Sequence, residues 1–172
     1  MPERPLILTG FMGSGKSSVG RVLAKRLACP FIDLDNEIVV AAGRTINEIF
    51  AQDGEQAFRR QETICLEKVL QLGRSVIATG GGIVIAAENR SLMRARGIVV
   101  NLEVSLSQVL ERLHGATDRP LFNGSDPANS VKLLMDGRKQ FYAEADIRID
   151  TDGKSVEDVA AEILSCVKGL RA

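Results

Sequence analysis

Residues 10–18 read GFMGSGKSS, and they contain the complete pattern G-x-x-x-x-G-K-S/T. An apolar run over 5–10 precedes the pattern, and apolar residues at helical spacing follow it over 19–27. In this context the glycines let the backbone curl so that its N–H groups point inward, and the start of the helix adds positive potential. The stretch therefore predicts a loop that holds the phosphates of a nucleotide, with an ordinary glycine-rich turn as the alternative.

The polar residues of this loop have separate expected roles. Lys16 would reach the outer phosphates, and the Ser17 hydroxyl would ligate Mg²⁺. The residues expected to bind the nucleotide here are Gly13, Ser14, Gly15, Lys16, Ser17 and Ser18. The loop does not indicate where the terminal phosphate goes, so the acceptor site has to be sought elsewhere in the chain.

Short apolar runs alternate with longer helical patterns along the rest of the sequence. Strands are expected over 5–10, 30–33, 75–82, 97–104 and 147–150. Helices are expected near 34–42, 45–51, 55–72, 85–96, 105–114, 127–144 and 155–169. Such alternation produces a parallel sheet covered on both faces, with ligands at the carboxyl ends of the strands. We expect an α/β fold, a three-layer αβα arrangement with a five-stranded parallel sheet, in one domain over 1–172.

The composition narrows the class of function. Lys and Arg number 22, as do Asp and Glu, so no overall basic field attracts nucleic acid. No apolar run reaches the roughly 20 residues of a membrane span. The chain opens MPERPLILTG without a signal-peptide pattern and has three cysteines without a C-x-x-C pair, which favours a reduced, cytoplasmic location. No coiled-coil pattern is present, so a monomer is expected.

Two carboxylates follow the second expected strand, in the sequence FIDLD over 31–35. A carboxylate at the end of a strand beside a phosphate loop suits a Mg²⁺ site. Asp33 and Asp35 are two residues apart, so in extended backbone they would face the same side. One could hold the metal while the other accepts a hydrogen bond from an acceptor hydroxyl. Alternatively, Asp35 caps the next helix.

The sequence ATGGG over 78–82 follows the third expected strand. Three glycines leave the backbone bare, so a ligand can approach the N–H groups of Gly81 and Gly82 closely. A tight turn from strand to helix is an equally good interpretation.

The segment HGATDRPLFNGSDP over 114–127 has no clear periodicity. Loops of this length inside a compact domain are functional lids or disordered segments. We expect a lid over about 113–125, in which Arg119 supplies a charge that closure could bring over a phosphate. A merely tolerated insertion is the alternative.

Taken together, these motifs resemble the shikimate kinase family. Seven segments occur in the order and spacing of that family, nearly end to end: GFMGSGKSSVGRVLA, FIDLDNEI, INEIF, GEQAFRRQE, VIATGGG, DRPLF and RKQFYAEAD. The resemblance implies a fold like that of nucleoside monophosphate kinases, with a substrate-binding region at about 33–62. It also implies transfer of the γ-phosphate of ATP to the 3-hydroxyl of shikimate, a step toward chorismate and the aromatic amino acids.

The resemblance implies roles for residues that spacing left open. Asp35 would hydrogen-bond shikimate hydroxyls, and Asp33 would be tied to magnesium. Arg59 and Arg138 would clamp the shikimate carboxylate, because planar guanidinium groups fix a carboxylate in orientation. The other implied contacts are Gly80, Gly81 and Gly82 for shikimate, Arg119 for both substrates, and Arg112 and Lys154 near the adenine. The implied catalytic residues are Lys16, Asp35 and Arg119.

The sequence also leaves some alternatives open and departs from the family pattern in places. A gluconate-type kinase on the same scaffold would also use an arginine pair for its carboxylate. A regulatory nucleotide switch would ordinarily carry N-K-x-D, and no Asn in this chain is followed by Lys. Asn101 stands where the family often has an aromatic residue, and no function is assigned to it from the sequence.

Overall fold

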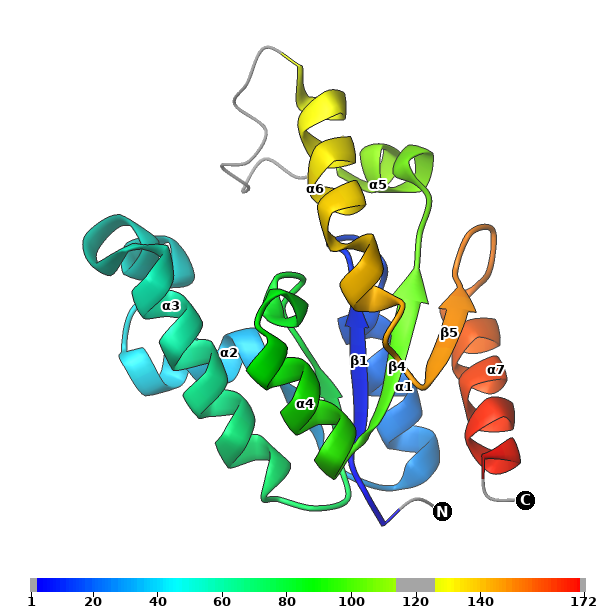
Figure 1. Cartoon of the computed structure of the whole chain (residues 1–172). Helices are drawn as coiled ribbons and strands as arrows, with labels where there is room; N and C mark the ends of the chain where they lie inside the picture. The colour runs from blue at the N-terminus through cyan, green and yellow to red at the C-terminus, as the bar shows by residue number, and fades with distance from the viewer. Residues whose placement is uncertain (1–2, 114–125, 171–172) are drawn as a thin grey trace.

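A computed structural model describes residues 3–113 and 126–170 of the chain, and a five-stranded parallel sheet forms its centre (Figure 1). The strands are β1 (Leu6–Gly10), β2 (Phe31–Asp33), β3 (Val76–Ala78), β4 (Ile98–Glu103) and β5 (Ile147–Asp150). Their order across the sheet is β2-β3-β1-β4-β5. The helices are α1 (Lys16–Leu27), α2 (Leu34–Ala42), α3 (Ile46–Leu70), η1 (Ile83–Ile85), α4 (Ala87–Arg96), α5 (Leu106–Leu113), α6 (Pro127–Tyr142) and α7 (Val156–Gly169). The expected parallel α/β fold is confirmed.

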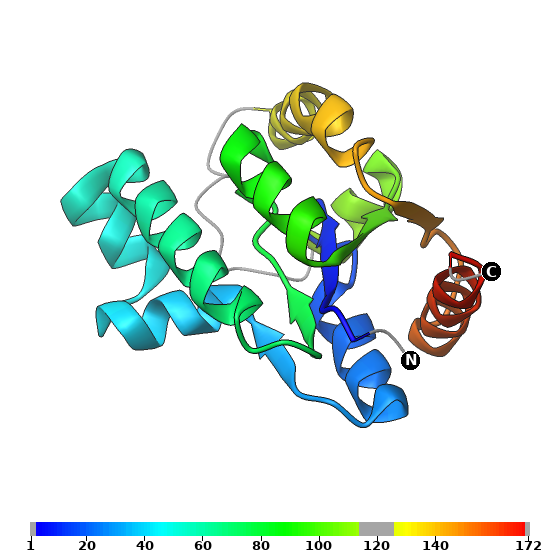
Figure 2. The same ribbon diagram turned by 60° about the horizontal axis from the view of Figure 1, so that its bottom comes forward.

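Alternating side chains of the strands build a separate apolar core on each face of the sheet. Leu6 and Leu8 of β1 pack with residues of α1 and α7. Ile7, between them, packs in a second cluster with residues of α3, α4 and α6. Figure 2 shows this layering, with α1 and α4 on opposite sides of the sheet. The three-layer αβα arrangement therefore follows from the period of two along the strands.

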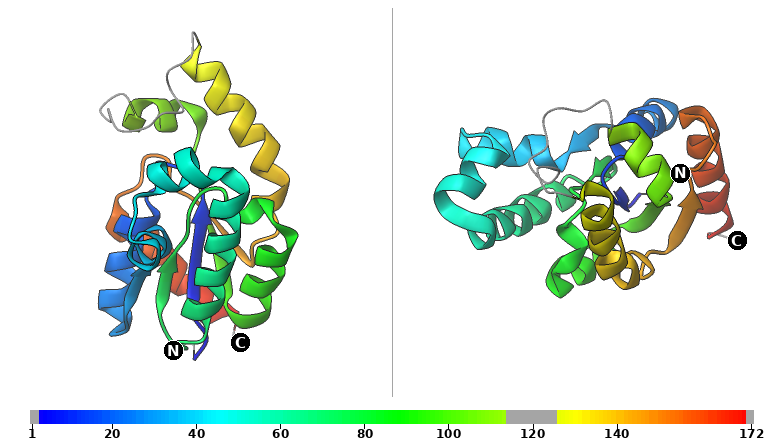
Figure 3. Two further views of the ribbon diagram at one scale, coloured as in Figure 1. Left: turned by 90° about the vertical axis from the view of Figure 1, so that its left-hand side faces the viewer. Right: turned by 90° about the horizontal axis from the view of Figure 1, so that it is seen from above.

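The two helices expected over 45–51 and 55–72 form one long helix, α3, with a kink between them. Thr45 caps its start together with Glu48 in a reciprocal capping box. Gly54 has φ 80° and ψ 172°, which is not helical backbone, and the two halves run in different directions (Figure 3, left). Within the described ranges, no helix combines the length and the apolar character needed to cross a membrane.

The strands end along one edge of the sheet, and α5 and α6 stand above that edge (Figure 1). The prediction of a strand over 75–82 is wrong beyond Ala78. β3 ends at that residue, and the glycines that follow form a turn into η1. Without side chains, those glycines offer nothing to pack against the sheet faces. The lid expected over about 113–125, with Arg119, falls almost wholly outside the described residues.

Candidate active site

The loop between β1 and α1 has the backbone of a phosphate cradle. Gly13 and Gly15 have φ values of 76° and 90°, in the left-handed region that residues with a side chain rarely adopt. Gly15 is the N-cap of α1 and no side chain caps this helix, so its first N–H groups can bind an anion. The Lys16 Nζ donates to the carbonyl oxygens of Gly10 and Phe11 at 2.8 and 3.0 Å. The lysine ammonium is thereby held at the loop.

Ser17 and Asp33 meet beside this loop, as a magnesium site requires. The Ser17 hydroxyl donates to Asp33 Oδ2 at 2.8 Å. Hydroxyl and carboxylate oxygens are hard ligands of the kind that Mg²⁺ prefers. In residues 3–113 and 126–170 no group of three or more His, Cys, Asp or Glu could hold a metal ion. The chemistry of this pair fits Mg²⁺, which is usually held by one or two protein oxygens together with phosphate oxygens and water.

The two carboxylates of FIDLD do not share one side of a strand. β2 ends at Asp33 and α2 begins at Leu34, so Asp35 lies in the first turn of a helix. The expectation from extended backbone is wrong because the chain changes from strand to helix between the two aspartates. Asp33, rather than Asp35, caps α2 by accepting from the Asn36 N–H. The two carboxylates consequently face different halves of the site.

Asp35 lines a cavity of about 650 Å³ beside the phosphate loop. Most residues implied to bind the acceptor line this same cavity: Asp35, Arg59, Gly80, Gly81, Gly82 and Arg138. Apolar residues of the first half of α3, among them Ile46 and Phe50, form another wall. A cavity of this volume with a few convergent polar groups has the dimensions and chemistry of a small-molecule site.

Each of the three glycines lies against charged side chains of the cavity. A Cβ on Gly80 would lie 2.8 Å from Asp35 Oδ1 and 3.1 Å from Glu62 Oε1, and a Cβ on Gly82 would overlap the guanidinium group of Arg59. Gly81 faces Arg138. The glycine run is thus both a turn and a surface that charged side chains approach closely, so the two interpretations of ATGGG are compatible.

A buried carboxylate orients Arg59. Arg59 Nη1 donates to Glu62 Oε2 at 2.9 Å, and Arg59 Nη2 pairs with Glu55 at 3.3 Å. The Glu62 side chain is 1% exposed, and burial raises the pKa of its carboxyl group. Because an ion pair in a dry environment is sensitive to geometry, Glu62 fixes the direction of the guanidinium group more firmly than a surface partner would.

A tyrosine holds α6 against the glycine turn. Tyr142 donates its hydroxyl proton to the carbonyl oxygen of Gly81 at 2.6 Å. Burial raises the pKa of Tyr142 to about 12, so the phenol remains a donor at neutral pH. Arg138 lies one turn earlier on α6, with its guanidinium carbon 5.9 Å from the centre of the Phe11 ring. Tyr142 therefore positions the helix that carries Arg138.

Comparison with known proteins agrees with this geometry. The family model described as shikimate kinase matches residues 12–168. A shikimate kinase of Geobacter metallireducens is 52% identical over 96% of this chain and 93% of its own length. The structure of a shikimate kinase from Acinetobacter baumannii in complex with shikimate superposes with a TM-score of 0.92 at 36% identity, covering 96% of this chain and 93% of that one. The chain belongs to the shikimate kinase family.

Membership of the shikimate kinase family defines the reaction class. The chain is an ATP-dependent phosphotransferase with an alcohol group of shikimate as acceptor. This decides between the alternatives that the phosphate loop left open, because neither a gluconate-type kinase nor a nucleotide switch is the family that matches.

Of the residues expected near the adenine, Arg112 contacts the phosphate loop and Lys154 does not. Arg112 of α5 donates to the carbonyl oxygen of Gly13, so it lies at the phosphate loop. Lys154 pairs instead with Glu162 of α7 at 2.7 Å, and this hydrogen bond raises the pKa of Lys154. Nothing in the described part of the chain brings Lys154 to the loop. Arg119 lies outside the described residues.

Glu62 and Tyr142 are the site residues that sequence reasoning missed. Glu62 lies three residues after Arg59, and Tyr142 lies four residues after Arg138. Both spacings put the residue on the same helix face as its arginine. This helical spacing could have indicated that each residue lies beside its arginine. It does not show whether that face of the helix is buried or exposed to solvent.

Proposed function

We propose that this chain transfers the γ-phosphate of ATP, bound with Mg²⁺, to the 3-hydroxyl of shikimate. The supporting observation is that Asp35, Arg59 and Arg138 line one cavity directly beside a phosphate loop. Met12 of that loop also lines the cavity, so a molecule bound there would lie next to the nucleotide phosphates. Positioning of this kind is the main contribution that a protein makes to phosphoryl transfer.

In the acceptor half, we assign the carboxylate of shikimate to Arg59 and Arg138. Two guanidinium groups can grip a planar carboxylate from two directions, which fixes the orientation of the ring. Asp35 accepts a hydrogen bond from an acceptor hydroxyl and orients it toward the γ-phosphate. The N–H groups of Gly80–Gly82 complete the polar surface. We assign about 33–62 as the substrate-binding region and about 113–125 as the lid.

In the donor half, Lys16 and the loop N–H groups bind the phosphates, and Arg119 contributes positive charge from the lid. Ser17 and Asp33 would hold Mg²⁺, which supplies charge neutralisation on the phosphate oxygens. Arg112 would contact the adenine or its ribose, and Lys154 the opposite side. We further propose that the enzyme works in the cytoplasm as a monomer.

The assignment of the carboxylate clamp is tested with the variant Arg138→Ala. Loss of a charge-assisted pair to a carboxylate should raise the Michaelis constant for shikimate at least tenfold. The Michaelis constant for ATP should change less than threefold. Steady-state ADP release measures both, and Arg60→Ala, an exposed neighbour of Arg59, is the matched control. An unchanged Michaelis constant for shikimate in Arg138→Ala would mean that Arg138 does not bind the acceptor.

A further inference from the structure

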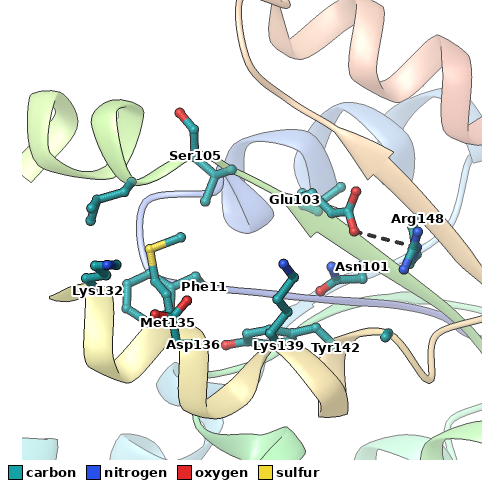
Figure 4. Close-up of a pocket in the computed structure, with 14 residues that line it drawn as sticks. Phe11, Asn101, Glu103, Ser105, Lys132, Met135, Asp136, Lys139, Tyr142 and Arg148 are labelled. Carbon is teal, nitrogen blue, oxygen red and sulfur yellow. Dashed lines mark ion pairs between the residues drawn. The ribbon is translucent and has the colours of Figure 1, made fainter.

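A second cavity, of about 470 Å³, lies between α6 and the ends of β4 and β5 (Figure 4). No residue that lines it also lines the acceptor cavity. On α6, Arg138 faces the acceptor cavity while its neighbour Lys139 lines the second one. Phe11 of the phosphate loop lines it, but Gly13–Ser18, the residues expected to bind the nucleotide, do not, so the second cavity is distinct from both halves of the site described above.

The walls of this second cavity are largely apolar. Phe11, Met135 and Tyr142 contribute aromatic rings and a thioether, and Val104 and Leu106 contribute aliphatic groups. Figure 4 shows Phe11 and Met135 close to the α6 side of the space. A surface of rings and a polarizable sulfur suits a planar, apolar body of one or two rings.

Asn101 puts an unused hydrogen-bond donor on this apolar surface. Its side chain belongs to β4, is 3% exposed, and points into the cavity (Figure 4). The Oδ1 atom accepts from the Thr9 hydroxyl at 3.3 Å. No hydrogen bond of the Asn101 Nδ2 is found among the described residues. The amide N–H groups therefore face the cavity, where a ligand atom or water can accept hydrogen bonds from them.

The charges at the mouth of the cavity favour an anion. Lys132 and Lys139 line it from α6, and neither forms an ion pair with any described residue. Arg148 of β5 is paired with Glu103 at 3.5 Å, so those two charges offset each other. Asp136 is the remaining carboxylate, which leaves one net positive charge on the lining.

We propose that this second cavity is a binding site for a small carboxylate with a planar apolar body, separate from the shikimate and ATP sites. The carboxylate accepts hydrogen bonds from the Lys139 ammonium and the Asn101 Nδ2, and the rings pack against Phe11 and Met135. The Asn101 amide and the Lys139 ammonium then have an acceptor, Lys132 adds positive charge at the mouth, and the apolar walls are covered. No part of this inference depends on which hydroxy acid the enzyme phosphorylates.

Methionine methyl groups distinguish the two cavities in a direct test. Met135 lines the second cavity, Met12 lines the acceptor cavity, and Met93 is buried elsewhere. In the full chain labelled with ¹³C-methyl methionine, 2-naphthoate should shift the Met135 resonance while shikimate is present at saturation. The Met93 resonance should stay in place. A shift of Met12 that shikimate abolishes, with none at Met135, would overturn the proposal.

Variants then test the chemistry of recognition by titration of 2-naphthoate. Asn101→Tyr fills the cavity and Lys139→Gln removes its charge, so affinity should fall at least tenfold and threefold, respectively. Met135→Trp fills the cavity from α6 and serves if Asn101→Tyr fails to fold. Lys168→Gln, on the exposed end of α7, is the matched control and should bind as the parent does. Equal binding by the parent and the folded cavity-filling variants would refute the site, as would equal binding of the neutral 2-naphthamide.

Discussion

At the scale of single residues, the burial of Glu62 destabilises its charged form, whereas its hydrogen bond to Arg59 stabilises that form. Its Oε2 accepts a hydrogen bond from Arg59, while its Oε1 is buried without a hydrogen-bond partner in the structure. Burial raises the pKa of Glu62, and Asp35 adds to the rise, although Arg59 and Arg138 act against it. The carboxyl group is therefore retained at a cost to stability, for the orientation that it gives Arg59.

The pH dependence of stability should reveal this cost. Because the pKa of Glu62 is raised on folding, the folded state loses its proton less readily than the unfolded state. The destabilisation is absent below the unfolded-state pKa and develops as the pH rises through the folded-state pKa. Glu62→Gln should raise the free energy of unfolding by about 1 kcal/mol at pH 8, and by less toward pH 5.

Urea denaturation across this pH range measures the effect of Glu62→Gln. Glu67→Gln, on an exposed position of α3, is the control and should show no comparable gain. A gain that grows as the pH falls would contradict the assignment of Glu62 as a destabilising buried acid.

Gly82 offers a second test at the residue scale. A methyl group there would overlap the guanidinium group of Arg59 and force it to move. Gly82→Ala should therefore raise the Michaelis constant for shikimate at least tenfold, while the affinity for ATP stays within a factor of three. Gly169→Ala, where nothing lies within 4 Å of the added group, is the control. Parental shikimate kinetics in Gly82→Ala would exclude Arg59 from the clamp.

At the scale of elements, the kink in α3 lets both halves of the helix line the acceptor cavity from different directions. The half before Gly54 carries Ile46 and Phe50 to the cavity, and the half after it carries Arg59 there and also packs Leu66 into the core. A straight helix would follow one direction for both halves. The kink thus lets one element form part of the core and still reach the acceptor cavity.

A pair of glycine variants tests whether Gly54 enforces this kink. Gly54→Ala meets no steric neighbour, but its φ of 80° is strained for alanine, so the free energy of unfolding should fall by about 1–2 kcal/mol. Gly137→Ala in α6 also has open space around it, and regular helical backbone should make it stabilising by about 1 kcal/mol. Thermal denaturation compares the two, and a stabilised Gly54→Ala would show that the kink is not set there.

The elements show how far sequence reasoning reached. The apolar period of each strand and helix is a local property, so the five strands and their covering helices could be predicted. The end of β3 could not, because a run of glycines is compatible with both extended and turning backbone. The place of Asp35 was also missed, although a helix near 34–42 was expected, because the side-chain alternation of extended backbone does not continue past the start of α2 at Leu34. Glu62 and Tyr142 required knowledge of which helix faces are buried.

At the scale of the whole molecule, the strand order brings the two halves of the reaction together. β1 ends at the phosphate loop and β3 ends at the glycine turn, and these strands are neighbours in the sheet. α6, far along the chain, crosses above the same edge and carries Arg138 to the acceptor cavity (Figure 1). Phosphate donor and acceptor sites are therefore adjacent because of topology, which sequence motifs alone could not specify.

The most direct test of the central claim is ADP release by the full chain with ATP and Mg²⁺, measured with shikimate, with gluconate and without an acceptor. Because two guanidinium groups and Asp35 would orient a single ring in the cavity, shikimate should increase the rate of ADP release at least 100-fold over the acceptor-free rate. Gluconate should give little or none. Equal rates with and without shikimate, or a greater rate with gluconate, would contradict the account.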